Sequence, residues 1–523
     1  MVMKKNYIFL KGILASLFLC ASFSSCSEDA MDKINEDRNH TQSVTAKFIL
    51  ADVFTSTAFS NMGGDINTYM SIYIEHEAGV HNQMYNAEIR SGEPARATTF
   101  NNSWRNTYNT LKDARIALKQ TSEGGRESGN AVTRGIAGVM AAYNSALLTD
   151  MFGDTPWSEA ATLTEVGSPL FMNPKVDKQQ DIYNNVFALL DNAIVDLQGS
   201  DLQGIGEYDF IYRGDKSKWA KFAYGLKARY TMRLLNQSSN KNADLEKVLD
   251  YVSQSFTSAN EQAAFALYDA TNLNPLFNYQ WSRDGLAASE SLSEKLIERN
   301  DPRLRRVFVD AAWSQITGTE DENYFMAPNG RTEQLQFYYN TSTFVYSQTA
   351  PTLLLSYHEL LFLKAEALTR LGRIEEAEAA LKNAVVAAIA NTEVGVSTAM
   401  SAPNVLMYGG LEETTEAITS EEAAAYFENS VKPLFTANPL RETMVQKYLA
   451  FFGASGESTE CYNDVRRLKA LGEDFIVLKN TANFPLRLPY GSTDVLNNPN
   501  VRDIFGDGQY VYSEPVWWAG GNR

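Results

Sequence analysis

Residues 353–389 read LLLSYHELLFLKAEALTRLGRIEEAEAALKNAVVAAI and predict two helices folded back on each other. Small and apolar residues recur along both halves with the 3.6-residue period of a helix: Leu361, Ala365 and Leu368, then Ala377, Leu381, Ala384 and Ala388. Glu375 and Glu376 stand where the second helix would begin, a position that favours negative charge. Gly372 is a typical helix stop between the two. The stretch therefore predicts an antiparallel helical hairpin.

The residue order in this hairpin, A-L-x-x-L-G-R-x-E-E-A-x-A-x-L, resembles a tetratricopeptide repeat, in which small alanines let two helices approach closely. One pair cannot bury its own apolar face, so about three or more stacked pairs are expected. Two earlier hairpins have the same helical period: residues 104–116 with 136–147, and 182–194 with 219–232. We expect a mainly α fold in which four or so tetratricopeptide-like hairpins form a scaffold.

The remaining segments read as long irregular excursions from that scaffold. Residues 79–96 are rich in Asn, Gly and Glu and predict a loop, and residues 272–350 predict mainly loops with a short helix at 291–299. Further helices are expected at 420–427 and 439–452, and the tail from residue 483 should wrap the body. Residues 45–523 are therefore predicted to form a single domain.

The N-terminus reads as a processing segment. Lys4 and Lys5 precede an apolar run at 12–23 that is too short to span a bilayer comfortably. Small residues then precede Cys26, an arrangement that resembles the lipobox of bacterial lipoproteins, and Ser27-Glu28-Asp29 is similar to the acidic surface-export tag of Bacteroidota lipoproteins. We expect a signal peptide at 1–25, an acyl chain such as palmitate on Cys26 and a flexible tether at 26–44. The alternative is an ordinary secretory signal with an incidental cysteine.

Charge and missing motifs exclude several classes of function. The formal charge of -17 argues against nucleic acid and anionic lipid, which need a basic surface. His76 and His81 are five residues apart and would diverge by roughly 140 degrees on a helix, so they cannot share a zinc ion. His358 is predicted to be a hydrogen-bonded core residue. We expect no catalytic site, cofactor or metal, although paired carboxylates remain open in a chain with 63 acidic residues.

Several motifs, in order along the chain, carry a resemblance to the SusD/RagB family of outer-membrane nutrient-binding lipoproteins. They are Asp150–Ala160 (DMFGDTPWSEA), Tyr212–Asp215 with Trp219 and Lys221-Phe222, Asp301–Leu304, Ser356–Leu368, Tyr462–Arg467 (YNDVRR) and Pro485–Tyr490 (PLRLPY). We interpret these residues first as structural, with Asp301 as a helix cap before Pro302 and Trp157 packed under a turn. The resemblance implies a SusD-like α-rich fold, anchored by lipid in the outer membrane and facing the cell exterior.

The same resemblance implies a function in nutrient uptake. Such a protein binds a nutrient, most often a glycan oligomer, and delivers it to a partner TonB-dependent transporter of the SusC type. Three alternatives stay open: a peptide-binding member of the same family, a tetratricopeptide adaptor that binds only envelope proteins, and a surface hydrolase.

A glycan site needs aromatic rings for the apolar faces of sugars, with amides and charges alongside for their hydroxyls. Residues 81–86 and 278–284 have that composition, and in relatives loops at about these places line the site. The candidate ligand-binding residues are Tyr85, Asn86, Tyr279, Trp281, Arg283, Trp313 and Tyr324. The alternative is that Tyr279 and Trp281 only pin a long excursion to the body.

Overall fold

The computed structural model describes residues 44–91, 99–164, 167–309, 325–331, 333–336, 338–407, 410–411, 415–505 and 510–523. The chain divides into a unit that ends at Thr45 and a unit from Ala46 to Arg523, and the following description concerns the second unit. The expected signal peptide, Cys26 and nearly all of the tether lie outside the described residues.

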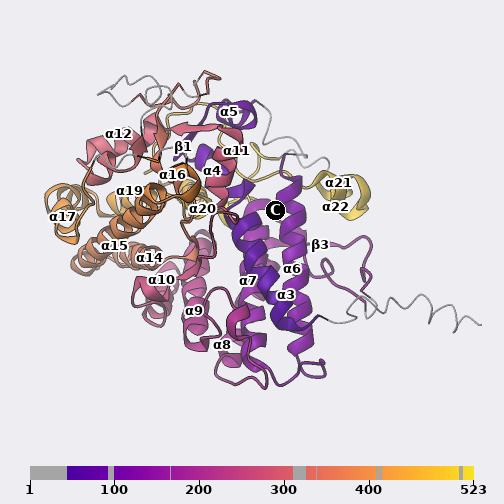
Figure 1. Ribbon diagram of the computed structural model, residues 1–523. Helices are drawn as coiled ribbons and strands as arrows, with labels where there is room; N and C mark the ends of the chain where they lie inside the picture. The colour runs from indigo at the N-terminus through magenta and orange to yellow at the C-terminus, as the bar shows by residue number, and fades with distance from the viewer. Residues whose placement is uncertain are drawn as a thin grey trace, which may run out of the picture. The chain divides into compact units, whose positions relative to one another are not determined.

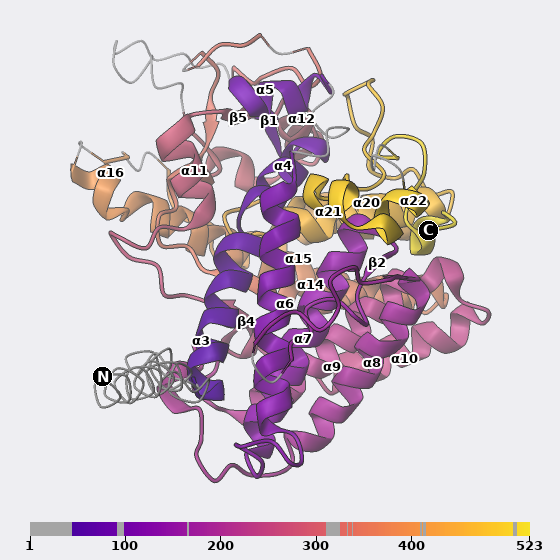
Figure 2. The ribbon, with the colours of Figure 1, turned by 90° about the vertical axis from the view of Figure 1, so that its right-hand side faces the viewer.

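Long α-helices pack side by side in chain order and form the scaffold (Figures 1 and 2). They are α3 (Ala46–Ser56), α6 (Asn101–Thr121), α7 (Ala131–Phe152), α8 (Gln179–Asp196), α9 (Lys216–Arg233), α10 (Lys241–Ser253), α14 (Tyr357–Arg370) and α15 (Ile374–Met400). Helix α6 packs on α7, α7 on α8, α9 on α10, α10 on α14 and α14 on α15. The expected mainly α scaffold of helical hairpins is confirmed.

The helical hairpin predicted within residues 353–389 is formed by α14 and α15. Ser356 caps α14 by accepting a hydrogen bond from the Glu359 backbone N–H, and Gly372 turns the chain with a φ of 76°. The predicted alanine stripe is buried between the helices. The helical stretch Ile374–Met407, which contains α15, is long and apolar enough to cross a membrane by length and composition, but α15 packs on α14 and α19, as expected of a core helix.

Shorter helices fill the spaces between and above these long ones. They are η1 (Thr57–Met62), α4 (Asp65–Tyr73), α5 (Asn82–Glu88), η2 (Gly206–Tyr208), η3 (Leu234–Gln237), η4 (Ala259–Glu261), α11 (Pro275–Arg283), α12 (Glu290–Glu298), η5 (Pro302–Arg305), η6 (Thr343–Tyr346), α16 (Pro403–Met407), α17 (Ser420–Tyr426), η7 (Phe427–Val431), α18 (Lys432–Ala437), α19 (Pro439–Ala450), α20 (Ser458–Ala470), α21 (Ser492–Asn497), α22 (Pro499–Phe505) and η8 (Trp517–Ala519).

Two of these helices correct the sequence analysis. Helix α5 lies inside the stretch predicted to be a loop, and α11 lies in the region predicted to be mainly loops. Helix α11 begins where the Asn274 side chain accepts hydrogen bonds from the next backbone N–H groups and Pro275 takes the first helical position. The Asn-Pro pair is a helix-start signal, which the abundance of Asn, Tyr and Trp around it obscured.

Short strands pair antiparallel and tie distant segments together. The pairs are β1 (Glu77–Gly79) with β5 (Leu286–Ala288), β2 (Thr155–Pro156) with β3 (Val176–Asp177), β4 (Ala263–Phe265) with β8 (Thr352–Leu355), and β6 (Phe308–Val309) with β7 (Thr341–Ser342). In the first pair, Glu77 lies opposite Ala288. This pairing joins the region after α4 to the region after α11.

Buried ion pairs cross the centre of the scaffold. Arg233 of α9 pairs with Asp150 of α7 and Glu460 of α20. Arg467 of α20 pairs with Glu366 of α14 at 2.6 Å, and neither side chain is exposed. Asp150 and Arg467 belong to motifs that carry the family resemblance, so their role in this structure is to connect core helices.

Other motif residues also have the structural roles expected of them. The Asp301 carboxylate accepts a hydrogen bond from the Arg303 backbone N–H at 3.0 Å and caps η5, with Pro302 in the first position. The Trp157 indole N–H donates to the Ser145 hydroxyl at 2.8 Å. His358 is buried, with its Nε2 atom 3.1 Å from Glu457, as the core interpretation predicts.

The C-terminal tail covers this charged centre. The Trp518 side chain is fully buried, and its ring lies over the guanidinium groups of Arg233 at 5.3 Å and Arg466 at 4.7 Å. Helix η8, which contains Trp518, packs on α8 and α20. The tail therefore wraps the body as expected.

Candidate functional site

The two sequence stretches predicted to bind ligand lie at one end of the unit. Helix α5 follows β1, and α11 precedes β5, so the β1–β5 pair brings the two helices together (Figure 1). The Val80 backbone N–H extends this contact by donating to the Gly285 carbonyl at 2.9 Å. Residues 81–86 and 278–284 are thus neighbours in space, although they lie mostly on helices and not on loops.

Tyr279 fastens α11 to α5. Burial raises the pKa of its hydroxyl, which lies close to the Gln83 side chain. A Cβ on Gly285 would come within 2.7 Å of that hydroxyl and 3.4 Å of the His81 carbonyl oxygen, so the close approach needs a glycine. Tyr279 therefore packs at the junction of the two stretches, which is the structural role considered for it from the sequence.

Trp281 has a different setting on the same helix. Its ring stacks on Phe277 with centroids 5.3 Å apart and planes 16° apart, and the side chain remains 46% exposed. Arg283, two residues on, is also exposed, and Tyr85 and Asn86 are half-buried on α5. These four residues line the same end of the molecule with aromatic and polar groups.

A third segment, residues 325–340, adds aromatic side chains that the sequence analysis did not select. Phe325 lies 4.9 Å from Tyr338 and 5.3 Å from Tyr339, between ring centroids, and Phe325 and Tyr338 are 39% and 50% exposed. The Gln336 side chain donates to the Arg283 carbonyl, which links this segment to α11. We call α5, α11 and residues 325–331, 333–336 and 338–340 the aromatic face.

The composition of the sequence around Tyr338 could have identified these aromatic residues as candidates. Gln336, Tyr338, Tyr339 and Asn340 combine amides with aromatic rings, as the two selected stretches do. The candidates Trp313 and Tyr324, by contrast, lie outside the described residues.

Buried carboxyl groups support the aromatic face from below. Glu88 accepts backbone hydrogen bonds from Gly79 at 2.9 Å and Gly330 at 2.7 Å, which holds residues near 330 against β1. Burial raises the pKa of Glu88 to about 7 and that of Glu77 to about 8. Burial also raises the pKa of Asp284, at the end of α11, to about 6. Glu88 is bonded to two backbone N–H groups and Asp284 accepts a hydrogen bond from the Gln280 side chain at 2.6 Å, which are structural roles, whereas one buried oxygen of Glu77 has no hydrogen-bond partner among the described residues.

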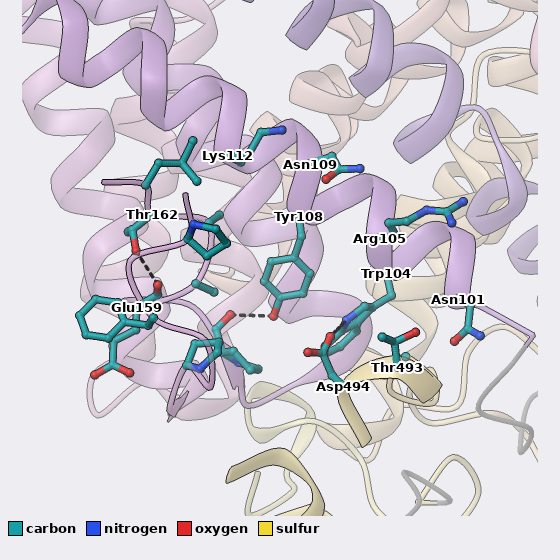
Figure 3. A pocket seen from close by; sticks show the side chains of 18 of the residues that line it. Asn101, Trp104, Arg105, Tyr108, Asn109, Lys112, Glu159, Thr162, Thr493 and Asp494 are labelled. Atoms are coloured by element: carbon teal, nitrogen blue, oxygen red, sulfur yellow. Dashed lines mark hydrogen bonds between the residues drawn. The ribbon is translucent and has the colours of Figure 1, made fainter. Parts of the chain in front are cut away.

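A cavity of about 530 Å³ lies on another side of the unit, and we call it the α6 groove (Figure 3). Its walls come from α6, from residues 156–163 and 169–174, and from residues 491–494. Tyr108 stands at its centre, with Glu159 and Thr162 to one side and Trp104 with Asp494 to the other (Figure 3). No residue predicted from the sequence to bind ligand lines this groove.

In the part of the chain that the structure describes, no cluster of three or more His, Cys, Asp or Glu side chains is placed to hold an ion. His76 is buried, bonded to Ser458 at 3.0 Å and to the Tyr448 carbonyl at 2.9 Å, and burial lowers its pKa to about 3. Its imidazole therefore has a structural role in the core.

Comparison with known proteins identifies the family. The family model named SusD-like, described as "Starch-binding associating with outer membrane", matches residues 38–490. The chain belongs to the SusD-like family. Members of this family are binding proteins associated with the outer membrane. No curated protein matches the chain.

Solved SusD-like structures agree with the fold. A SusD/RagB family protein from Bacteroides thetaiotaomicron is 55% identical, covers 92% of this chain and 100% of its own, and superimposes with a TM-score of 0.86. A chitin-binding protein is 22% identical over 91% of this chain and 100% of its own, with a TM-score of 0.68. A SusD homologue from Bacteroides fragilis is 19% identical over 91% and 100%, with a TM-score of 0.66. The last two similarities concern the fold alone.

Proposed function

We propose that this SusD-like protein captures a glycan oligomer on its aromatic face and passes it to a TonB-dependent transporter of the SusC type. The observation that carries the proposal is the exposure of Trp281, Phe325 and Tyr338 beside Arg283 and the amides of α5. Rings in this setting stack on the apolar faces of sugars, and the polar groups bond their hydroxyls. The protein acts as a binding protein and not as an enzyme.

The family context supports a glycan over a peptide. The family is described as starch-binding, and one protein of the same fold is a chitin binder. Both polysaccharides present pyranose rings with apolar C–H faces and equatorial polar groups. The aromatic face has the composition that such rings require.

The helical hairpins offer a separate surface to which the transporter could bind. Helices α8, α9 and α10 lie at the end of the unit away from α5 and α11 (Figures 1 and 2). Stacked helical hairpins offer extended surfaces to other proteins, so the transporter would bind there while ligand occupies the aromatic face. Acylation of Cys26 would hold the protein in the outer membrane, facing the cell exterior.

A binding screen of the purified protein against glycan and peptide panels tests the ligand. Calorimetry then compares the wild type with Trp281→Ala, Tyr338→Ala and Tyr85→Ala. Loss of a stacking ring should cost about 1 to 3 kcal/mol of binding energy, a roughly tenfold to hundredfold loss of affinity. Phe48→Ala is a matched control, because Phe48 is also 46% exposed but packs against Tyr208 on another part of the scaffold. Wild-type affinity in all three face variants would place the site elsewhere.

Co-purification tests the partner. The protein isolated from detergent-solubilised outer membranes should bring down one large β-barrel protein in near-equal amount. Recovery of the protein alone, under conditions where a known pair survives, would contradict the transporter proposal. Recovery of several envelope proteins with no glycan bound in the screen would favour the adaptor.

A further inference from the structure

The three walls of the α6 groove are braced against one another by hydrogen bonds. Asn101 and Ser492 exchange two hydrogen bonds, of 2.6 Å and 2.8 Å, and the Trp104 indole N–H donates to Asp494 at 2.5 Å. These bonds join α6 to residues 491–494. The Tyr108 hydroxyl donates to the Pro156 carbonyl at 2.6 Å and joins α6 to the second wall.

Hydrogen bonds also join the second wall to the third. The side-chain amide of Asn498 donates to the Pro174 carbonyl at 2.8 Å, so the segment after α21 holds residues 173–174. Arg115 supports the second wall from behind by donating to the carbonyls of Trp157 at 2.8 Å and Ala160 at 2.5 Å. Because each wall is bonded to the next, the groove is formed before any ligand arrives, as small-molecule sites usually are.

The lining of the groove combines hydrogen-bonding and apolar groups. Arg105, Asn109 and Lys112 follow one another along one side of α6 and span about 10 Å. The side-chain amide of Asn109 makes no hydrogen bond to any residue that the structure describes. The second wall contributes Glu159 and Thr162 and the following apolar side chains: Pro156, Leu163, Pro169, Phe171 and Pro174.

The charges in the groove cancel. Arg105 and Lys112 contribute two cations, and Glu159 and Asp494 contribute two carboxylates. A ligand with a strong charge of either sign would meet like charges as well as opposite ones, which disfavours it. The balance therefore suits a neutral ligand that both donates and accepts hydrogen bonds.

An extended peptide fits these walls poorly. Its main chain would need a free strand edge, whereas the backbone N–H groups of α6 are bonded within the helix, and Pro156, Pro169 and Pro174 have no N–H to offer. The bonding groups available are side-chain donors and acceptors of both kinds. Hydroxyl groups match them, since each hydroxyl donates one hydrogen bond and accepts others.

We infer that the α6 groove is a second carbohydrate site, which takes a neutral pyranose against Tyr108 and Phe171 with its hydroxyls on Arg105 and Asn109. A volume of about 530 Å³ is within the range of small-ligand sites. The inference shares its ligand class with the proposed function but rests on different residues. The two sites can therefore be tested separately.

The probes are four neutral monosaccharides, glucose, galactose, mannose and N-acetylglucosamine, with tri-alanine blocked at both ends (N-acetylated and C-amidated) as a neutral peptide. Crystals of the protein are soaked in each probe, and binding is titrated in solution by NMR. We expect at least one sugar in the α6 groove. Asn109→Ala should weaken its binding about tenfold through the loss of one good hydrogen-bonding group.

Two further variants control this measurement. Thr493→Trp should abolish binding in the groove, because Thr493 is an exposed lining residue and a large side chain there fills the cavity. Lys119→Ala should leave binding unchanged, because Lys119 is exposed on the same helix outside the groove. Circular dichroism checks that all three variants fold.

The outcomes separate the two carbohydrate sites. A sugar in the groove whose affinity falls in Asn109→Ala and Thr493→Trp supports the inference, whether or not the aromatic face also binds. Sugar found only at the aromatic face, or at neither place, overturns it. Tri-alanine in the groove in place of the sugars overturns the assigned ligand class.

Discussion

Glu366→Ala tests whether the buried ion pairs hold the scaffold together. Glu366 is fully buried and accepts hydrogen bonds from Arg467 at 2.6 and 2.8 Å and from Arg370 at 2.8 Å. Its removal leaves Arg467, also fully buried, with Asp464 as the remaining partner at 2.9 Å. Breaking a buried pair by removing one partner typically costs about 3 to 5 kcal/mol. We expect a loss of unfolding free energy of that order.

Urea unfolding at pH 7, followed by circular dichroism, measures the loss. The matched control is Glu376→Ala in the same hairpin, where Glu376 pairs with Arg373 on the surface at 2.7 Å and the two side chains are 58% and 41% exposed. An exposed pair contributes little, so this variant should unfold close to the wild type. A Glu366→Ala midpoint no lower than that of Glu376→Ala would refute the reasoning.

The Glu366 carboxylate should also make the stability of the protein depend on pH. Burial alone would raise the pKa of Glu366, but attraction to Arg467 and Arg370 outweighs it and lowers the pKa to about 2. Because the folded pKa lies below the unfolded value of about 4.3, Glu366 contributes stability that is present above that value and lost as the pH falls toward 2. The difference in stability between the wild type and Glu366→Ala should therefore shrink over this window.

Three further changes have defined outcomes. Glu77→Gln should stabilise the protein at pH 8 but not at pH 4. Burial raises the pKa of Glu77 to about 8, so the wild type loses stability as the pH rises from the unfolded pKa to the folded one, where the unfolded chain releases a proton that the folded chain keeps. Unfolding midpoints of the variant that equal those of the wild type at both pH values would contradict this. Asp301→Ala removes the cap of η5 and the partner of the buried Arg303, and should lower the unfolding free energy by about 3 to 5 kcal/mol, with Asp301→Asn in between, measured by urea unfolding. Cys26→Ala should yield a protein that does not incorporate a palmitate analogue and leaves the membrane fraction; continued labelling would contradict the lipid anchor.

The scaffold was predictable because helical period is a local property. The alanine stripe of α14 and α15 and the stop at Gly372 are visible in a short stretch of sequence. The charges inside the scaffold were not predictable in the same way. Arg229 and Arg233 on α9 resemble a solvated face in the sequence, and only the carboxylates of three other helices, brought close by packing, allow them to be buried.

The candidate sites were harder to predict for a related reason. Composition located Trp281 and Tyr85, but their proximity depends on the pairing of β1 with β5, which lie far apart in the chain. The aromatics near Tyr338 were missed because they stand in a segment without regular period. The α6 groove combines three distant segments, and no single one of them has the composition of a site.

The position of Trp518 links the stability of the charged centre to the presence of η8. Its ring covers Arg233 and Arg466, so the interior charges are sealed from water only when the last residues are in place. A chain shortened before Trp517 would expose the ends of α9 and α20 to solvent and raise the population of locally opened states. Proteases act on such states, so cells would degrade a chain cut before Trp517 faster than one that keeps η8.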